Sequence, residues 1–306
     1  MRNYCSPSSA DQEVCYVDSD FDLIIDVYNK HFSPKISKKN SNKYNTLNSR
    51  LKKYVGDKSH FLWIDFICQY CSTEDCNKLQ KISDKRLMPR KPASWYVNHN
   101  AWLSNFDIEN VLIHYHNTKK YKYELIGVFT VDFAVKDQQG RCLYAEQKKC
   151  NLDIKDVIKR GKNCMGIVTN LDKHDQPGSH WTSLFFVINP NIDSYGIYYY
   201  DSTGAGIPSL VMIYIKDIQE QLRKIYPKSK KIPVITNKKQ YQFSNTECGM
   251  FAITYQVVWI THLYRNKKTE NSDILNKNFN DKNMSILRDY FFTPRNDAKI
   301  PIKNKI

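Results

Sequence analysis

Apolar residues recur with the 3.6-residue period of an α-helix in four stretches of the chain. These stretches are residues 17–31, 107–116, 208–226 and 248–264. The first opens with a capping-type aspartate and the third with a proline, both of which favour the start of a helix. The fourth is apolar nearly all round, so we expect it to be a helix buried in the centre of a domain.

Short runs rich in β-branched and aromatic residues predict strands. These runs are residues 164–170, 183–189, 195–201 and 231–237. Between the second and third runs, Pro-Asn-Ile-Asp-Ser has the chemistry of a turn. We therefore expect these two strands to form an antiparallel hairpin.

Two polar stretches divide the N-terminal part of the chain. Residues 33–59 are rich in Ser, Lys and Asn, which predicts a loop or flexible arm leading into a short helix. Residues 85–94 form a connector rich in Lys and Pro, and we place a domain boundary near residue 95. The predicted units are a mostly helical N-terminal extension with basic flexible loops (1–95), a larger domain (96–295) and a mobile tail (296–306).

The composition is that of a globular protein, because 41% of the 306 residues are hydrophobic and 25% are charged. No stretch holds the roughly 18 uninterrupted apolar residues that a membrane-spanning helix needs, and the N-terminus lacks the apolar core of a signal peptide. We expect the chain to stay in a reducing intracellular compartment, with its nine cysteines as thiols. The odd number agrees, because nine cysteines cannot all pair within one chain.

The chain is strongly basic, with 46 Lys and Arg against 31 Asp and Glu and a formal charge of +15. This charge favours salt-sensitive association with DNA or another polyanion. An excess of lysine also arises from the base composition of AT-rich genomes, so both interpretations stay open. The basic run at residues 85–91 is typical of a nuclear signal or nucleic-acid patch, and more often of a solvated linker.

Cys248 is a candidate nucleophile because it opens the apolar helix at 248–264, behind the polar turn Phe-Ser-Asn-Thr-Glu. A thiol reacts as its thiolate, and a helix N-terminus beside a histidine lowers its pKa. Taken alone, a cysteine that opens an apolar helix is more often a buried structural residue than a nucleophile.

Three further residues make a nucleophile a better interpretation of Cys248 than a structural cysteine. His180 lies between a Pro-Gly loop and an apolar strand, where its imidazole would face solvent at a rigid edge as a general base. Asp201 ends the next strand, and hairpin pairing would bring it close enough to orient the imidazole. Gln242 could donate an N–H to the developing oxyanion, with the Cys248 backbone N–H as second donor. Singly, His180 also fits a surface histidine and Asp201 an Asx turn.

The combination carries a resemblance to a known family. Its motifs are His-Trp at 180–181, Asp-Ser at 201–202 and Gln-x5-Cys-Gly at 242–249, together with AWLSNFDIENVL at 101–112. They resemble the ubiquitin-like-protein (SUMO-specific) cysteine proteases, most closely the processing proteases of large cytoplasmic DNA viruses of the asfarvirus and poxvirus type. The adenovirus protease is more distant. The resemblance spans roughly residues 100–292.

The resemblance implies a fold and a set of roles. The implied fold is an α+β, papain-like cysteine protease core of the SUMO-protease type, with helices packed on a central mixed or antiparallel sheet. Cys248 would be the nucleophile, His180 the base, Asp201 the orienting acid and Gln242 the oxyanion donor. No cofactor is implied.

The resemblance also implies how substrate is held. Trp102 and Trp181 would flank a narrow tunnel beside Gly249 that admits only a Gly-Gly or Gly-Ala main chain, because two indole walls exclude larger side chains. Trp181 fits a packed core position equally well. Asn105 and Asp107 are further candidates for binding the substrate. The acidic residue, Asp107, stands two positions later than in the family's pattern, so the resemblance does not extend to recognition of the substrate by an acid at that position.

Cys68, Cys71 and Cys76 form a C-x2-C-x4-C pattern with His60 upstream. The second pair of ligands at a typical zinc spacing is missing, so we predict structural thiols and no metal site.

These features favour a viral endopeptidase that cuts structural or core polyproteins after Gly-Gly-Xaa or Gly-Ala-Xaa motifs during virion maturation. We would expect it in the host cytoplasm, the viral factory and the virion. A SUMO or ubiquitin-like-modifier isopeptidase shares every active-site residue and stays open as an alternative. A second alternative is a non-catalytic nucleic-acid or scaffold-binding protein on a protease fold.

Overall fold

The computed structural model describes residues 4–9, 14–229, 231–265, 269–275 and 278–294. The predicted mobile tail, residues 296–306, lies outside the described residues. The chain divides into two compact units, residues 1–93 with 289–306, and residues 94–288. The second boundary therefore falls before the predicted residue 295. Residues 289–294 group with the N-terminal unit because Thr293 exchanges backbone hydrogen bonds with Pro89 and Lys91 at 2.7 and 2.9 Å.

The N-terminal unit is helical, as predicted. Its main helices are α1 (Asp18–His31), α2 (Lys43–Val55), α3 (Trp63–Cys68) and α4 (Thr73–Arg86), with a short 3-10 helix η1 (His60–Leu62). They enclose a core that includes Ile24, Leu51, Trp63 and Ile67, all fully buried. Residues 43–55 form a full helix inside the stretch where a loop and a short helix were predicted.

Helix α4 was not predicted because its composition is polar, with only Leu79 and Ile82 as buried apolar residues. Capping signals were present nonetheless. The Ser72 hydroxyl accepts a hydrogen bond from the Asp75 backbone N–H, and basic residues fill the last turn.

The second unit is built on a five-stranded mixed sheet with the order β1-β2-β3-β4-β5. Its strands are β1 (Tyr123–Thr130), β2 (Cys164–Asn170), β3 (Trp181–Val187), β4 (Gly196–Tyr200) and β5 (Val234–Thr236). β3 is antiparallel to β2 and to β4, whereas β1 pairs parallel to β2 and β5 parallel to β4. The predicted hairpin of β3 and β4 is confirmed. β1 was not predicted, and its pairing is broken by a register shift between Leu125 and Gly127.

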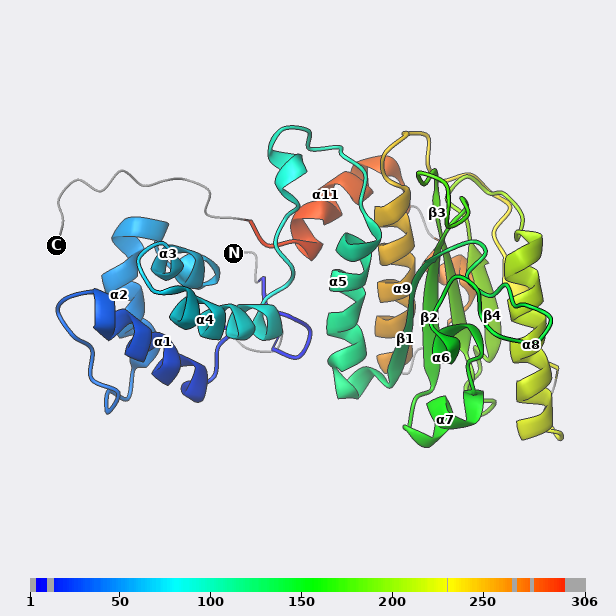
Figure 1. The fold of residues 1–306 in the computed structure, drawn as a ribbon, viewed down its shortest axis with the longest axis horizontal. Helices are drawn as coiled ribbons and strands as arrows, with labels where there is room; N and C mark the ends of the chain where they lie inside the picture. Colours follow the sequence, from blue (N-terminus) through cyan, green and yellow to red (C-terminus); the bar gives the residue numbers. More distant parts are fainter. Residues whose placement is uncertain (1–3, 10–13, 230, 266–268, 276–277, 295–306) are drawn as a thin grey trace. The chain divides into compact units, whose positions relative to one another are not determined.

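Helices cover both faces of this sheet (Figure 1). Helices α5 (Asn105–Asn117) and α9 (Cys248–Tyr264) lie on one face, and α8 (Ser209–Ile225) lies on the other. Side chains of β3 alternate between the faces, so Leu184 and Phe186 join the core beneath α8 while Phe185 stacks on Trp259 of α9. The predicted burial of α9 is confirmed.

The remaining elements are short or lie at the C-terminal end. They are η2 (Ala93–Tyr96), η3 (Lys119–Tyr121), α6 (Gln147–Cys150), α7 (Ile154–Lys159), α10 (Asn271–Ile274) and α11 (Asp281–Phe291).

The cysteines depart from the expectation that all nine are thiols. Disulfides join Cys5 to Cys15, Cys68 to Cys76 and Cys142 to Cys150, and the free cysteines are Cys71, Cys164 and Cys248. Each pair lies within ten residues in sequence, with Cα atoms 4.9–6.0 Å apart, a separation that a disulfide can span. Composition alone could not reveal which cysteines the fold brings this close.

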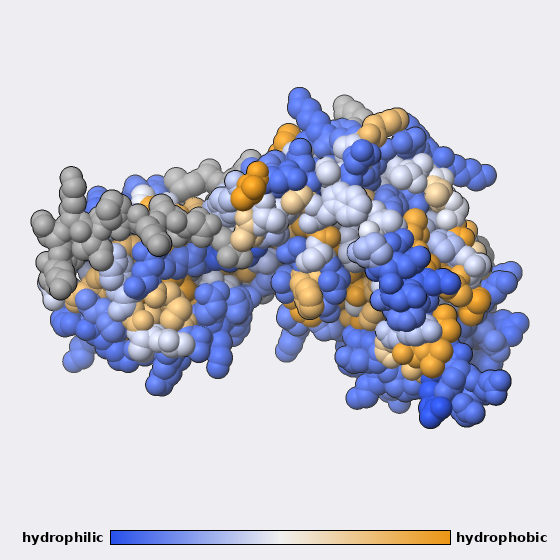
Figure 2. All heavy atoms as spheres, turned by 45° about the horizontal axis from the view of Figure 1, so that its top comes forward, coloured by the Kyte–Doolittle hydropathy of each residue, from blue (hydrophilic) through white to orange (hydrophobic). Residues whose placement is uncertain are grey.

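The surface is mainly polar. On the face in Figure 2, hydrophilic residues cover most of the area and hydrophobic residues lie in separate patches. In the part of the chain that the structure describes, no helix combines the length and apolarity needed to cross a membrane.

Gly166 offers a test of how tightly α9 packs on the sheet. An added Cβ would overlap Gln256 Oε1 and crowd the Tyr123 hydroxyl, and Gln256 Nε2 also donates to Ser183 Oγ at 2.8 Å. We expect Gly166→Ala to lower the free energy of unfolding by about 1–3 kcal/mol, measured by urea denaturation. Gly206→Ala is the matched control, because its Cβ would meet nothing within 4 Å. Equal stability of the two variants would contradict the packing described here.

Candidate active site

The register of the sheet brings His180 and Asp201 to the same edge. Ser183 of β3 pairs with Tyr200 of β4 in antiparallel register, so the residue before β3 and the residue after β4 leave the sheet side by side. There His180 Nε2 donates to Asp201 Oδ1 over 2.9 Å. The sequence had placed the imidazole facing solvent, but its side chain is only 15% exposed.

The turn before His180 is held by two polar residues at the end of β2, Asn170 as its last residue and Asp172 just after it. Asn170 Oδ1 accepts from the Ser179 backbone N–H at 3.1 Å, and Asp172 accepts from the Gly178 backbone and the Ser179 hydroxyl at 3.0 and 2.6 Å. Gly178 has a φ of +97°, a conformation that favours glycine. The Pro-Gly loop therefore delivers His180 from a fixed turn.

Asp201 is buried and accepts several hydrogen bonds. Besides the bond from His180, Oδ1 accepts from the Thr203 backbone and hydroxyl, each at 2.8 Å. Asn237, just after β5, holds the Asp201 backbone from both sides. Its Oδ1 accepts from the Asp201 backbone N–H at 3.0 Å, and its Nδ2 donates to the Asp201 carbonyl at 2.6 Å. Burial raises the pKa of Asp201, but the bonds from His180 and Thr203 outweigh it and lower the pKa below its ordinary value. The carboxylate is therefore ionised beside the imidazole.

The Cys248 side chain is the second group that raises the pKa of the His180 imidazole. Because Nε2 is engaged by Asp201, Nδ1 is the ring nitrogen left for the thiol. Burial lowers the pKa of His180, but the bond to Asp201 and then the Cys248 side chain outweigh it and raise the pKa to about 9. Cys248 itself is buried and is the first residue of α9, where the helix dipole favours a negative charge. The surroundings of His180 therefore favour its charged imidazolium form beside Cys248.

Gln242 lies in the segment that precedes α9 and is also buried. Its Oε1 accepts from the Ser202 hydroxyl at 2.6 Å, and its Nε2 donates to the Ser244 carbonyl at 2.7 Å. The amide nitrogen carries two hydrogens, so one N–H remains after these bonds. Ser202 was not singled out as a site residue, although it directly follows Asp201. Its hydroxyl links the turn after Asp201 to Gln242, the predicted oxyanion donor.

The two predicted tunnel tryptophans are each fixed by the indole N–H. Trp181 donates to the Leu103 carbonyl at 2.9 Å, and Trp102 donates to the Asn245 carbonyl at 2.8 Å. The Trp102 side chain remains half-exposed. Gly249 packs against Leu103, because an added Cβ would lie 3.0 Å from that side chain. The structure therefore gathers these residues around the start of α9.

Asp107 has a structural task at the start of α5. Its carboxylate accepts from the Ser104 backbone N–H and hydroxyl at 2.8 and 2.7 Å, which completes a capping box. Asn105 is the first residue of the helix and is exposed. A part for either residue in substrate binding stays a prediction.

A second cysteine–histidine contact lies in the N-terminal unit, where Cys15 Sγ is 3.1 Å from His60 Nε2. Cys15 is disulfide-bonded to Cys5, so it offers no thiolate. Burial lowers the pKa of His60 to about 4, which keeps its ring neutral. The sulfurs of Cys68, Cys71 and Cys76 lie within 4.8 Å of one another, but the disulfide between Cys68 and Cys76 occupies two of these three candidate metal ligands.

Several viral proteins are similar to this chain in sequence. No family model matches the sequence. A protein of Acanthamoeba polyphaga mimivirus named as a thiol protease is 25% identical over 269 residues, which cover 83% of each chain. African swine fever virus proteins named cysteine protease or SUMO-1 cysteine protease are 27–28% identical over 175 residues, 56% of this chain and 62% of theirs. The homologues of this chain are viral cysteine proteases.

The fold agrees with these homologues. The crystal structure of the African swine fever virus protease superimposes with a TM-score of 0.60 at 22% identity, over 87% of this chain and 94% of that one. The predicted fold class, an α+β SUMO-protease-type core with a mixed sheet, is confirmed.

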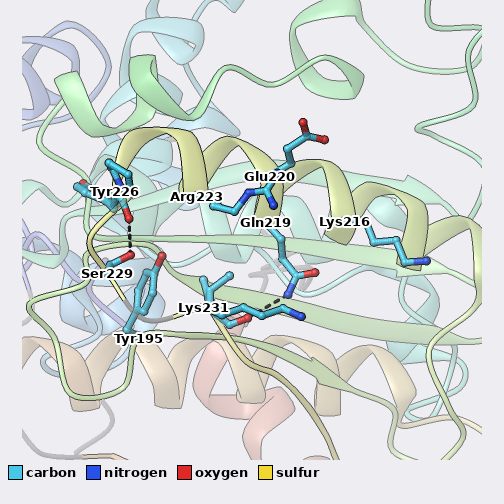
Figure 3. A pocket seen from close by; sticks show the side chains of 10 residues that line it. Tyr195, Lys216, Gln219, Glu220, Arg223, Tyr226, Ser229 and Lys231 are labelled. Atoms are coloured by element: carbon cyan, nitrogen blue, oxygen red, sulfur yellow. Dashed lines mark hydrogen bonds between the residues drawn. The ribbon is translucent and has the colours of Figure 1, made fainter.

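A separate cavity of about 480 Å³ lies along α8, away from the catalytic edge (Figure 3). Lys216 and Arg223 of α8 line it together with Lys231, Tyr195 and Tyr226. Among the described residues, none forms an ion pair with any of these three cations. The cavity therefore presents three cations and aromatic rings together with one carboxylate, that of Glu220, which lies near Arg223 and forms an ion pair with Lys224. The sequence did not reveal this place.

The charge state of His180 can be tested directly by NMR. We expect its imidazole protons to titrate with a midpoint near pH 9 in the wild-type protein. In Asp201→Asn the midpoint should fall by about 1–3 units, because burial still opposes the charge after the carboxylate is removed. Asp193→Asn, at the turn between β3 and β4, should leave it unchanged. An unaltered midpoint in Asp201→Asn would show that Asp201 does not stabilise the imidazolium.

Proposed function

We propose that this chain is a cysteine endopeptidase in which Cys248, His180 and Asp201 form the catalytic triad. The observation that carries the proposal is the hydrogen bond between the Asp201 carboxylate and His180, with Cys248 at the start of α9 as the second group that acts on the same imidazole. A nucleophile, a base and an orienting acid within hydrogen-bond reach are the arrangement that acyl transfer through a thiol requires.

In the proposed reaction, the Cys248 thiolate attacks the carbonyl carbon of the scissile peptide bond, and the carbonyl oxygen becomes an oxyanion. Gln242 Nε2 and the Cys248 backbone N–H would donate to this oxygen. The His180 imidazolium then gives its proton to the leaving amine, which departs and leaves an acyl-enzyme. His180 next takes a proton from water as the water attacks the thioester, and the acid product leaves with Cys248 restored.

The proposed specificity is for small residues before the scissile bond, in Gly-Gly-Xaa or Gly-Ala-Xaa sequences. Trp102 and Trp181 have rings oriented by bonds to the backbone, and Leu103 packs against Gly249 beside the nucleophile. Rigid aromatic walls at this point would exclude larger side chains by shape.

We further propose that the natural substrates are viral structural or core polyproteins cut during virion maturation, in the host cytoplasm, the viral factory and the virion. The viral origin of the homologues supports this choice. The alternative substrate is a ubiquitin-like modifier, and the name SUMO-1 cysteine protease given to relatives from African swine fever virus favours it. The complete triad geometry argues against a non-catalytic binding protein.

Peptide cleavage separates these substrates. We expect turnover of short Gly-Gly-Xaa peptides and little turnover of SUMO- or ubiquitin-terminal amide probes. Cys248→Ala should abolish cleavage, and Gln242→Ala should lower kcat by about 10²- to 10³-fold through loss of one oxyanion donor. Cys71→Ala is the matched control, because it removes a free thiol from the other unit. Fast hydrolysis of a modifier probe without peptide cleavage would support the isopeptidase instead, and activity in Cys248→Ala would overturn the proposed mechanism.

A second proposed property is association with DNA through the cavity along α8. Lys216, Arg223 and Lys231 give this surface three cations against the single carboxylate of Glu220, and Tyr195 offers a ring for stacking. The net charge of +15 would add a long-range attraction.

Salt-dependent binding tests this property. We expect the triple variant Lys216→Gln, Arg223→Gln and Lys231→Gln to weaken binding to a labelled DNA in fluorescence anisotropy. The slope of log affinity against log salt should fall by about 0.9 for each phosphate that the variant no longer neutralises. A triple variant of exposed lysines elsewhere, Lys148→Gln, Lys155→Gln and Lys173→Gln, removes the same charge. Equal slopes for the two triple variants would place the DNA-binding surface outside this cavity.

A further inference from the structure

Helix α11 carries two charged residues that hold opposite ends of the segment between the oxyanion donor and the nucleophile, residues 242–248. These residues are Asp281 and Arg288, which are separated by seven positions. Seven residues are close to two turns, so both side chains leave the same face of the helix about 10 Å apart along its axis. No element was predicted at this place from the sequence.

Asp281 holds the first end of the segment. Its Oδ2 accepts from the backbone N–H groups of Phe243 and Ser244 at 2.8 and 3.1 Å, and its Oδ1 accepts from the Ser244 hydroxyl at 2.8 Å. The Ser244 carbonyl in turn accepts from Gln242 Nε2 at 2.7 Å. The Phe243 side chain is 77% exposed, so its own burial does not hold the segment here. The carboxylate of Asp281 does so instead.

Arg288 holds the other end, and its guanidinium is fully buried. Nε donates to the Glu247 carboxylate at 2.9 Å, and Nη2 donates to the Thr246 carbonyl at 3.2 Å. Glu247 is the residue immediately before Cys248. The backbone at the start of α9 is therefore tied to α11 by a buried ion pair.

The same guanidinium also supports the wall of the predicted substrate tunnel. Nη1 donates to the carbonyls of His99 and Ala101 at 3.1 and 2.9 Å, directly before Trp102. The Arg288 guanidinium also stacks over the Trp95 ring at 4.4 Å from its centroid. All three guanidinium nitrogens are thus used, which the single ammonium of a lysine could not reproduce.

We propose that Asp281 and Arg288 are positioning residues, which set the oxyanion donor, the nucleophile and the Trp102 wall relative to one another. This inference rests on the proposed function of Gln242 and Cys248. Neither residue touches the reacting atoms, so each acts through the segment that it holds. Asp281 acts on Gln242 through Ser244, whereas Arg288 acts on Cys248 through Glu247 and on Trp102 through Ala101.

Substitutions of Asp281 and of Arg288 should have different effects on kcat, KM and the alkylation of Cys248. Removal of the Asp281 carboxylate should misplace only the oxyanion donor, which acts in the transition state. We expect Asp281→Asn to lower kcat roughly tenfold to a hundredfold while KM stays within about twofold of the wild-type value. The rate at which iodoacetamide alkylates Cys248 should be unchanged, because the thiol and His180 keep their relative positions.

Removal of the Arg288 guanidinium should alter both the nucleophile and the substrate wall. We expect Arg288→Met to lower kcat, raise KM and slow alkylation of Cys248. Arg288→Lys should behave in the same way, because a lysine keeps the charge but not the planar set of donors. Since Arg288→Met leaves Glu247 buried without a partner and can fail to fold, Arg288→Lys and Asp281→Asn keep the proposal testable.

The experiment measures kcat and KM on a Gly-Gly-Xaa peptide for the full-length chain, with alkylation of Cys248 followed by mass spectrometry. Active sites are counted in each sample, so that a merely unfolded fraction does not lower the kcat per site. Lys282→Gln is the matched control, because Lys282 is an exposed residue of the same helix. It should keep wild-type kcat, KM and alkylation rate.

The outcomes separate this proposal from the proposed function. If the wild-type chain cleaves peptides and Asp281→Asn keeps its kcat per active site, the positioning role of Asp281 is wrong. Equal losses in Lys282→Gln would show a general effect of the helix and overturn the specific role of Asp281 and Arg288. If the wild-type chain cleaves nothing, the proposed function fails, but alkylation still decides the role of Arg288. An unchanged alkylation rate in Arg288→Lys would then overturn it.

Discussion

The antiparallel register of β3 and β4 determines where chemistry can take place in this molecule. Because Ser183 lies opposite Tyr200, the strand that begins after His180 and the strand that ends before Asp201 meet at one edge. The same register points Leu184 and Phe186 toward α8 and Phe185 toward α9. A slip of one residue would turn these apolar side chains to the wrong faces. The packing of the core therefore also sets the 2.9 Å contact between His180 and Asp201.

The charged groups of the site are unusually buried, and each is paired. Asp201 lies against His180, and Glu247 lies against the fully buried Arg288. A buried ion pair contributes little net stability, because removing two charges from water costs about as much as their attraction returns. Removing one partner is costly, however. Such pairs are consequently better at fixing one geometry than at stabilising the fold, and both pairs here sit beside the nucleophile.

The elements nearest the chemistry were the ones that the sequence revealed. β2, the hairpin and α9 have strong local patterns, because each is buried on both sides or ends in clear turn residues. β1 was missed because Gly127 and the register shift beside it interrupt the regular strand, so its residues do not follow one simple alternation. Helix α11 was missed although Met284, Leu287 and Phe291 stand at helical spacing. Its contacts with residues 243–247 are long-range, so the local sequence could not reveal them. The disulfides were missed for a related reason, since proximity of cysteines depends on the folded backbone.

The proposed catalytic residues followed from order and residue type, but the residues that support them did not. Ser202, Asn237, Asp281 and Arg288 each hold a site residue through a single polar contact or a small group of them. Ser202 belongs to the Asp-Ser motif that follows β4, but nothing in the local sequence distinguishes Asn237, Asp281 and Arg288 from ordinary surface asparagines or charged residues. Only the three-dimensional arrangement shows that they converge on residues 242–248 and on Asp201.

This arrangement also explains why the chemistry is better defined than the substrate. A thiolate attacks the carbonyl of a peptide or of an isopeptide in the same way, so Cys248, His180 and Asp201 cannot discriminate between them. In the proposed function, discrimination between substrates depends on surfaces such as Trp102, whose indole N–H donates to the Asn245 carbonyl within the segment that α11 supports. The proposed nucleophile and the proposed substrate wall are thus both held by α11. Loss of the Arg288 guanidinium should accordingly alter both, whereas loss of the Asp281 carboxylate should alter catalysis alone.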